Sequence, residues 1–139
     1  MVGDLYMDAC QCEICGERYW AGNTHVCPPY ASLRAANIAR NVEWTAGKDK
    51  LSLSFRGNEL AGEVGEACNI LKKLDRERMG MVGSKSSVAH LAEELADVII
   101  CVDLIAMDLG INLREAVVRK FNKTSAQRGL KTKMKEGGK

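Results

Sequence analysis

Apolar side chains recur at helical spacing through the second half of this chain, and this periodicity restricts the fold more than any other feature. Between residues 51 and 75 the spacings are four, three, four and three, at Leu60, Val64, Ala67, Leu71 and Leu74. After residue 87 the same period continues at Leu91, Leu95, Val98, Val102, Ile105 and Leu109. Such stripes predict two long amphipathic helices that pack along their length.

Two more helices are predicted on either side of this pair. Residues 31–43 carry a modest apolar face, and residues 112–128 open with the capping-box-like Asn112-Leu-Arg-Glu115. Ser86 or Ser87 is the expected N-cap of the third helix, and Gly110 is expected to end it. We therefore expect an all-α protein, with a helical domain over residues 31–128 and a basic, flexible tail over residues 129–139.

Composition and charge exclude several classes of protein. The 139 residues carry a formal net charge of only +2, and part of that excess lies in the terminal "KTKMKEGGK". This ending is typical of a solvated tail, so nucleic-acid binding is not indicated. No apolar run approaches the roughly 20 residues of a membrane span. Asp4 and Asp8 interrupt the N-terminus where a signal peptide would be apolar, so we expect a cytoplasmic protein without membrane contact.

Residues 1–30 are rich in cysteine and predict a small zinc knuckle before the helical domain. Cys12 and Cys15 are separated by two residues, a spacing that can direct two thiolates at one ion. The preferred structural Zn²⁺ ligands are Cys12, Cys15, His25 and Cys27. Cys10 competes with His25 for the fourth position. Four protein ligands leave no open position, so this site would be structural and not catalytic.

Acidic side chains border both central apolar stripes at the same offset. Glu59, Glu63 and Glu66 share one face of the second helix, each one residue before an apolar position. Glu94 and Asp97 repeat this arrangement on the third helix. Packing of the two stripes would bring these carboxylates together at the edge of the seam, where they could bind Mg²⁺, or Mn²⁺ in its place. The alternative is a pair of solvated acidic faces.

Two neighbouring features bear on this acidic site. Gly62 and Gly65 flank Glu63 at a cost of roughly 1 kcal/mol each relative to Ala in a helix, which close approach of a ligand or another backbone would explain. His90 lies one helical turn before Glu94, where it either tunes the site or is an ordinary residue of the helix face.

The segments "ELAGEVGEA", "EELADVI" and "KFNKTSAQRG", in this order, resemble the MazG-like all-α nucleoside triphosphate pyrophosphohydrolases over about residues 31–128. The resemblance implies a MazG-like four-helix bundle in which Mg²⁺ binds the substrate triphosphate. Water then attacks the α-phosphorus and releases a nucleoside monophosphate and pyrophosphate. The implied Mg²⁺ ligands are Glu63, Glu66, Glu94 and Asp97. The sequence departs from the family at Gly62, where the first of two adjacent acids is usual, and Glu59 could supply that carboxylate.

Roles for the remaining polar residues stay open at this stage. The general base that accepts the proton of the attacking water is either Glu59 or Glu63. Three cations of the last helix, Lys120, Lys123 and Arg128, could bind the outer phosphates, or could simply complement the helix macrodipole. The base and sugar of the substrate are not identified, although the resemblance favours deoxynucleotides.

Four modest helices bury a limited core, and the family generally builds its sites in multimers, so we expect a homodimer or homotetramer. The competing class of function is a non-enzymatic interaction module, in which the zinc knuckle binds a partner and the helices only oligomerise. A second enzymatic alternative is triphosphate hydrolysis that releases orthophosphate.

Overall fold

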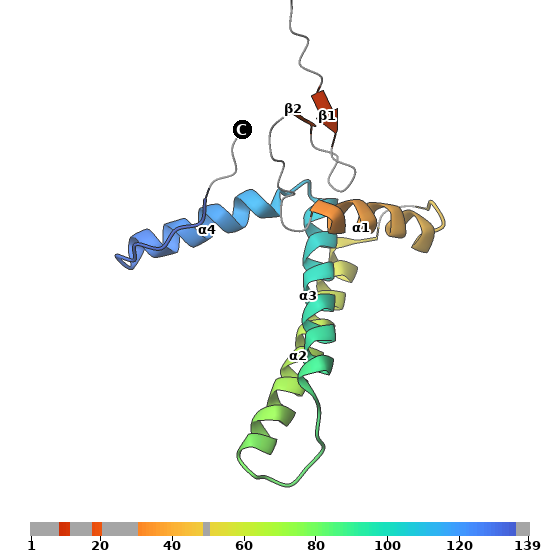
Figure 1. The fold of residues 1–139 in the computed structure, drawn as a ribbon. Coiled ribbons are helices and arrows are strands. Elements are labelled where there is room, and N and C mark those ends of the chain that lie inside the picture. The colour runs from red at the N-terminus through yellow and green to blue at the C-terminus, as the bar shows by residue number, and fades with distance from the viewer. Residues whose placement is uncertain (1–8, 12–17, 21–30, 49–50, 136–139) are drawn as a thin grey trace, which may run out of the picture.

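A computed structural model describes residues 9–11, 18–20, 31–48 and 51–135. Four helices make up the body of the molecule: α1 (Ala31–Trp44), α2 (Leu53–Arg78), α3 (Val88–Asp108) and α4 (Leu113–Gln127). Two short strands precede them, β1 (Ala9–Gln11) and β2 (Arg18–Trp20), and pair in antiparallel register with Cys10 opposite Tyr19. The predicted all-α helical domain is confirmed (Figure 1).

Helix ends follow local signals in the sequence. The side chains of Ser52, Ser87 and Asn112 each accept a hydrogen bond from the backbone N–H three residues later, so they cap α2, α3 and α4. Ser87 rather than Ser86 is therefore the N-cap of α3. Gly80 and Gly110 follow α2 and α3 with φ near 70° and 66°, a conformation that favours glycine and ends a helix.

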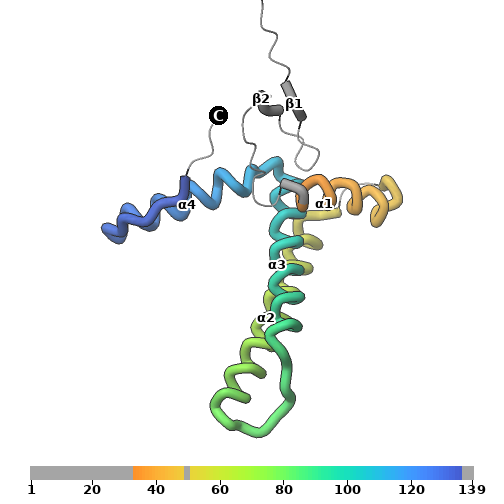
Figure 2. Tube along the Cα trace, viewed as in Figure 1, coloured from red at the N-terminus to blue at the C-terminus, as the bar shows by residue number. Residues whose placement is uncertain are grey.

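The packing centres on an antiparallel hairpin of α2 and α3. These two helices lie side by side, and α1 packs against α3 across the end where α2 begins (Figure 1). By contrast, α4 leads away from the hairpin and has no extensive contact with another helix of the described residues (Figure 2). The described residues of one chain thus form no closed four-helix bundle. None of their helices is both long and apolar enough to span a membrane.

Part of the predicted tail folds back along α4. The Asn122 side chain donates to the carbonyl of Met134 at 3.0 Å and accepts from the Met134 N–H at 2.8 Å. Val118 and Ser125, which lie on either side of Asn122 in α4, are buried. The described part of the tail is therefore held against α4 at Met134.

The buried face of α2 is rotated from the predicted stripe. Ala67 and Ile70 are buried, whereas Val64 and Leu71 of the predicted stripe are 42% and 49% exposed. Leu95 of α3 is also exposed. The prediction that these three side chains line the core is wrong for the single chain, because polar residues occupy much of the seam in their place.

Two buried polar networks connect α1 to the hairpin. In the first, Arg34 and Asn37 of α1 both donate to Asp103 of α3, at 2.9 Å each. In the second, Arg56 of α2 donates to Asn41 of α1 and Asp108 of α3, at 2.6 and 3.1 Å. Asn37, Asp103 and Arg56 are all at least 96% buried, so their hydrogen bonds are needed to offset lost hydration. These networks fix which sides of the helices face inward.

Candidate metal centre

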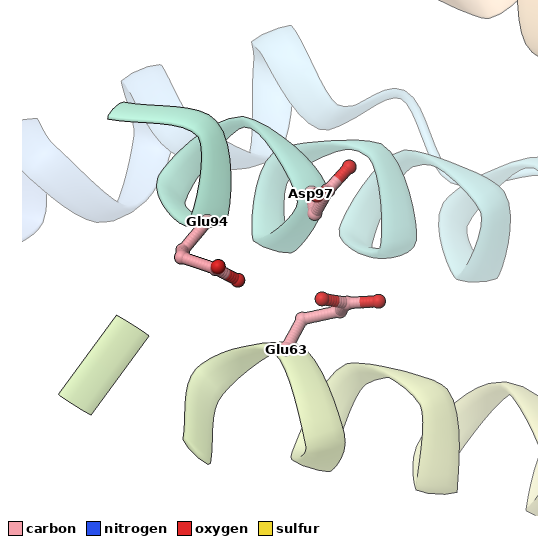
Figure 3. A group of neighbouring side chains, drawn as sticks. All are labelled: Glu63, Glu94 and Asp97. Carbon is pink, nitrogen blue, oxygen red and sulfur yellow. The ribbon is translucent and has the colours of Figure 1, made fainter. Parts of the chain in front are cut away.

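Three carboxylates converge between α2 and α3. Glu63 comes from α2, while Glu94 and Asp97 come from α3, where a spacing of three residues puts them on the same side of the helix. One oxygen from each carboxylate lies within 4.8 Å of the others. Figure 3 shows Glu63 and Glu94 reaching toward each other across the space between the helices, with Asp97 one turn further along α3.

The three carboxylates differ in burial. Glu94 is only 8% exposed, Glu63 is half-buried and Asp97 is exposed. The group therefore begins inside the seam and opens to solvent at Asp97. The sequence placed these acids beside the packing stripe, whereas the structure places Glu63 and Glu94 in the seam itself. Such a site can hold a cation on one side and admit water or a phosphate on the other.

The carboxylates repel one another when no cation lies between them. Burial raises the pKa of Glu63 above its ordinary value, and the nearby charges of Asp97, Glu66, Glu94 and Glu59 raise it further. A bound cation would relieve this repulsion and favour the ionised form. The cluster therefore has the electrostatic character of a cation site.

The residues present fit Mg²⁺. Two oxygens on one octahedral Mg²⁺ are about 3 to 4.2 Å apart, given metal–oxygen distances of about 2.1 Å. Carboxylate oxygens within 4.8 Å of each other reach that spacing with small side-chain rotations. Carboxylates with water in the remaining positions are the usual ligands of this ion, and Mn²⁺ accepts the same set.

Cys101, one turn beyond Asp97 on α3, does not add a soft ligand to this group. Its side chain is buried, and burial raises the pKa of the thiol, as do the nearby charges of Glu59, Glu63 and Asp97. Its sulfur is also not among the candidate ligand atoms that lie within 4.8 Å of one another, which come from Glu63, Glu94 and Asp97. The site is therefore an all-oxygen one that suits hard cations.

Two other acids of α2 that the sequence singled out lie outside the group of three. Glu66 is exposed and contributes no oxygen within the 4.8 Å limit. Glu59 is half-buried, and its Oε2 lies 3.4 Å from Arg56 Nη1. Even so, the charges of Glu59 and Glu66 both raise the pKa of Glu63, so these two carboxylates lie near the group of three.

Sequence reasoning missed Arg56. This side chain is 4% exposed and contacts Glu59, Asp108 and Asn41, so it joins the acidic region of α2 to the base of the hairpin. A signal was present, because Arg56 lies four residues before Leu60 on the predicted stripe. A cation at an apolar stripe position indicates a buried ion-pair network.

The three cations expected to bind phosphate are not brought to the carboxylates within one chain. Lys120, Lys123 and Arg128 are exposed on α4 or at its C-terminus, and α4 leads away from the hairpin (Figure 1). Any contribution from them to the same site would have to come from another copy of the chain.

The two glycines beside Glu63 are not explained by packing within the chain. A Cβ atom added at Gly62 or Gly65 would meet nothing within 4 Å among the described residues. A close approach at these glycines would therefore have to come from a ligand or a second chain.

The predicted zinc site falls outside the described residues. Cys12, Cys15, His25 and Cys27 all lie in segments that the structure does not describe, and for Cys10 only the backbone in β1 is described. The structural zinc thus stays a prediction from spacing, as does the choice between Cys10 and His25.

Compared with protein-family models, curated proteins and solved structures, the chain has no match. The resemblance to the MazG-like enzymes therefore depends on the sequence motifs alone, and the function has to be argued from the carboxylate group.

Proposed function

We propose that this protein is a Mg²⁺-dependent nucleoside triphosphate pyrophosphohydrolase, which converts a nucleoside or deoxynucleoside triphosphate to the monophosphate and pyrophosphate. The observation that carries the proposal is the convergence of Glu63, Glu94 and Asp97 from two helices at a seam that opens to solvent. Such a cluster suits triphosphate hydrolysis, because carboxylates that hold a divalent cation can use it to screen the phosphate charges, whereas carboxylates alone would repel the substrate.

Each carboxylate has a distinct place in the proposed site. Glu94 would hold the cation from the buried side, Glu63 from α2 and Asp97 from the solvent side. Mg²⁺, when bound, neutralises phosphate charge and helps to place the attacking water. The reaction forms a bond between the water oxygen and the α-phosphorus and breaks the bond from that phosphorus to the α,β-bridging oxygen, so that pyrophosphate leaves. Glu66 is exposed one turn from Glu63 and is the further ligand that the resemblance implies.

Of the two candidate bases, the geometry favours Glu63. Glu59 is already engaged with the buried cation Arg56, whose Nη1 lies 3.4 Å from Glu59 Oε2, and it lies outside the group of three carboxylates. Glu63 lies within the group of three, and its second oxygen is available to accept a proton even when the first binds the cation.

The proposed site is completed by a second copy of the chain. Exposed apolar side chains line the outside of the hairpin at Val64, Leu71, Leu95 and Ile99. Burying them would stabilise a homodimer or homotetramer, and Lys120, Lys123 and Arg128 of a neighbouring copy could then bind the outer phosphates. Light scattering should show a dimer or tetramer at micromolar concentrations, and a monomer would contradict this part of the proposal.

Product analysis tests the activity directly. Purified protein is incubated with a panel of nucleoside and deoxynucleoside triphosphates and Mg²⁺, and the products are separated. Monophosphate and pyrophosphate in equal amounts support the proposal, whereas orthophosphate would indicate a different hydrolase. The E63Q variant should lose activity. The matched control is E93Q, because Glu93 is exposed on α3 next to Glu94 and lies outside the carboxylate group.

A non-enzymatic interaction module is the second candidate, and the exposed apolar side chains favour it. Met79, Met81, Val82 and Val88 are 56 to 99% exposed around the turn between α2 and α3. If the protein binds Mg²⁺ or a triphosphate and yet hydrolyses none of the triphosphates in the panel, that result would support the interaction module over the enzyme.

A further inference from the structure

A histidine and a serine form a chain of contacts that ends on the buried carboxylate of the metal centre. His90 Nε2 lies 2.9 Å from Glu94 Oε1, and the other ring nitrogen, Nδ1, lies 3.2 Å from Ser86 Oγ. The three residues are spaced four apart, so Ser86, His90 and Glu94 follow one another along the same side of the chain as α3 begins. The sequence had left His90 as either a tuning residue or an ordinary residue of the helix face.

His90 covers the buried ligand from the solvent side. The His90 side chain is 48% exposed, whereas that of Glu94 is 10% exposed. Among the described residues, no other side chain lies within ion-pair or hydrogen-bond distance of Glu94. A buried carboxylate needs a donor for its oxygens, and the one that the structure supplies is the imidazole.

The chemistry of the three groups fits one pattern of donors and acceptors. With a hydrogen on Nε2, the imidazole can donate to Glu94 Oε1, while Nδ1 accepts the hydroxyl hydrogen of Ser86. This use of Oε1 leaves Oε2 of Glu94 available to a cation. Metal-binding carboxylates are commonly held in this way by a second group, whose loss weakens the metal site.

We propose that His90, supported by Ser86, is a positioning residue that orients Glu94 for cation binding. This inference rests on the proposed metal site at Glu63, Glu94 and Asp97. The alternative is that His90 and Glu94 form an ordinary (i, i+4) helix pair, which stabilises the helix slightly and contributes nothing to cation binding. The two roles differ in what happens to cation affinity.

The test measures Mn²⁺ binding to the full chain at one fixed pH, from the signal of free Mn²⁺ in electron paramagnetic resonance. H90L removes both ring nitrogens and should weaken Mn²⁺ binding about 10- to 100-fold. H90Q keeps an N–H donor at the end of a side chain of similar reach, and should recover most of that loss. S86A should weaken binding less than H90L does, because it removes only the support of the imidazole.

The matched control is K85M. Lys85 is next to Ser86 in the sequence, but its side chain forms an exposed ion pair with Glu77, at 2.8 Å, and not with Glu94. K85M should bind Mn²⁺ as the parent does. Circular dichroism of each variant shows whether the helices persist. If H90L is poorly folded, S86A serves as the test, because Mn²⁺ binding weakens in S86A only if the supported imidazole positions Glu94.

The outcomes separate this inference from the proposed site. If the parent binds Mn²⁺ and E63Q does not, but H90L and H90Q both bind it as the parent does, the positioning role is overturned and the site stands. If the parent does not bind Mn²⁺, or E63Q binds it equally well, the site and the inference fail together. Loss in H90L with recovery in H90Q supports both.

Discussion

Glu63 of α2 and Glu94 of α3 face each other across the seam of the hairpin, with carboxylate oxygens within 4.8 Å (Figure 3). Two acids in such a position destabilise the fold while both are ionised. A cation between the two carboxylates would stabilise the seam, and the energetics of this pair can be measured without knowing the substrate.

Replacing Glu63 should separate stability from metal binding. E63Q keeps the size of the side chain but removes its charge, so the metal-free protein should melt at a higher temperature than the parent. Mg²⁺ at 100 times its Kd should stabilise the parent by about 2.7 kcal/mol and should leave E63Q almost unchanged. Thermal unfolding with and without Mg²⁺ measures both effects. If Mg²⁺ stabilises E63Q as much as the parent, Glu63 is not a ligand of the cation. The control variant is E93Q.

The pH dependence of metal-free stability should also identify Glu63. Because its folded-state pKa is raised, the folded chain takes up this proton at a higher pH than the unfolded chain does. The destabilisation is therefore complete above the folded pKa and is relieved as pH falls through it. The advantage of E63Q over the parent should be largest above the folded-state pKa of Glu63 and should shrink as the pH falls through it. Denaturant unfolding in a chelator at several pH values measures the difference, and an advantage that grows with acidity would contradict the assignment.

The Arg56 network should dominate the stability of the hairpin base. Arg56 Nε lies 3.1 Å from Asp108 Oδ2, and the two side chains are 4% and 9% exposed. D108N leaves a buried guanidinium with one fewer charged partner, so it should cost about 3 kcal/mol or more of the free energy of unfolding. The control is D75N, which breaks the exposed Arg78–Asp75 pair and should change stability little. Urea unfolding compares the two, and similar costs would show that burial of the network does not matter.

The glycines of α2 test whether another chain or a ligand approaches Glu63. A Cβ at Gly57, Gly62 or Gly65 meets open space among the described residues. G57A should stabilise the helix by up to about 1 kcal/mol. G62A and G65A should do the same in an isolated chain, but should weaken association if a second copy packs against this face. Sedimentation at several protein concentrations distinguishes these cases. If G57A, G62A and G65A all associate as the parent does, no second copy packs closely at Glu63.

The zinc prediction is tested by metal content. Protein purified under reducing conditions without added metal should contain about one zinc per chain. Serine in place of Cys12, Cys15 or Cys27 should release that zinc, as should H25A if His25 is the fourth ligand. C10S should retain it in that case. If C10S loses zinc while H25A retains it, the fourth ligand is Cys10 and not His25. If the parent protein contains no zinc, the prediction of a zinc knuckle is wrong.

The sequence by itself predicted the four helices and several of their ends, although it left Ser86 and Ser87 open as the cap of α3. Ser87 and Asn112 cap helices through hydrogen bonds to residues three positions later, and Gly110 ends α3 through its own backbone conformation. Such signals act within about one helical turn, so they can be read without knowledge of the fold. The same is true of the spacing that put Glu94 and Asp97 on one side of α3.

Only the tertiary structure decided which side of each helix faces inward. Glu63 lies in the seam while Val64 and Leu71 are exposed, although hydrophobicity alone favours the reverse. The sequence also did not predict that α4, which carries Lys120, lies away from the hairpin. The reason is that the rotation of a helix is set by partners far away in the sequence, here Asp108 for Arg56 and Asp103 for Asn37. Periodicity shows which residues share one face of a helix. Contacts between residues far apart in the sequence determine where that face points in the fold.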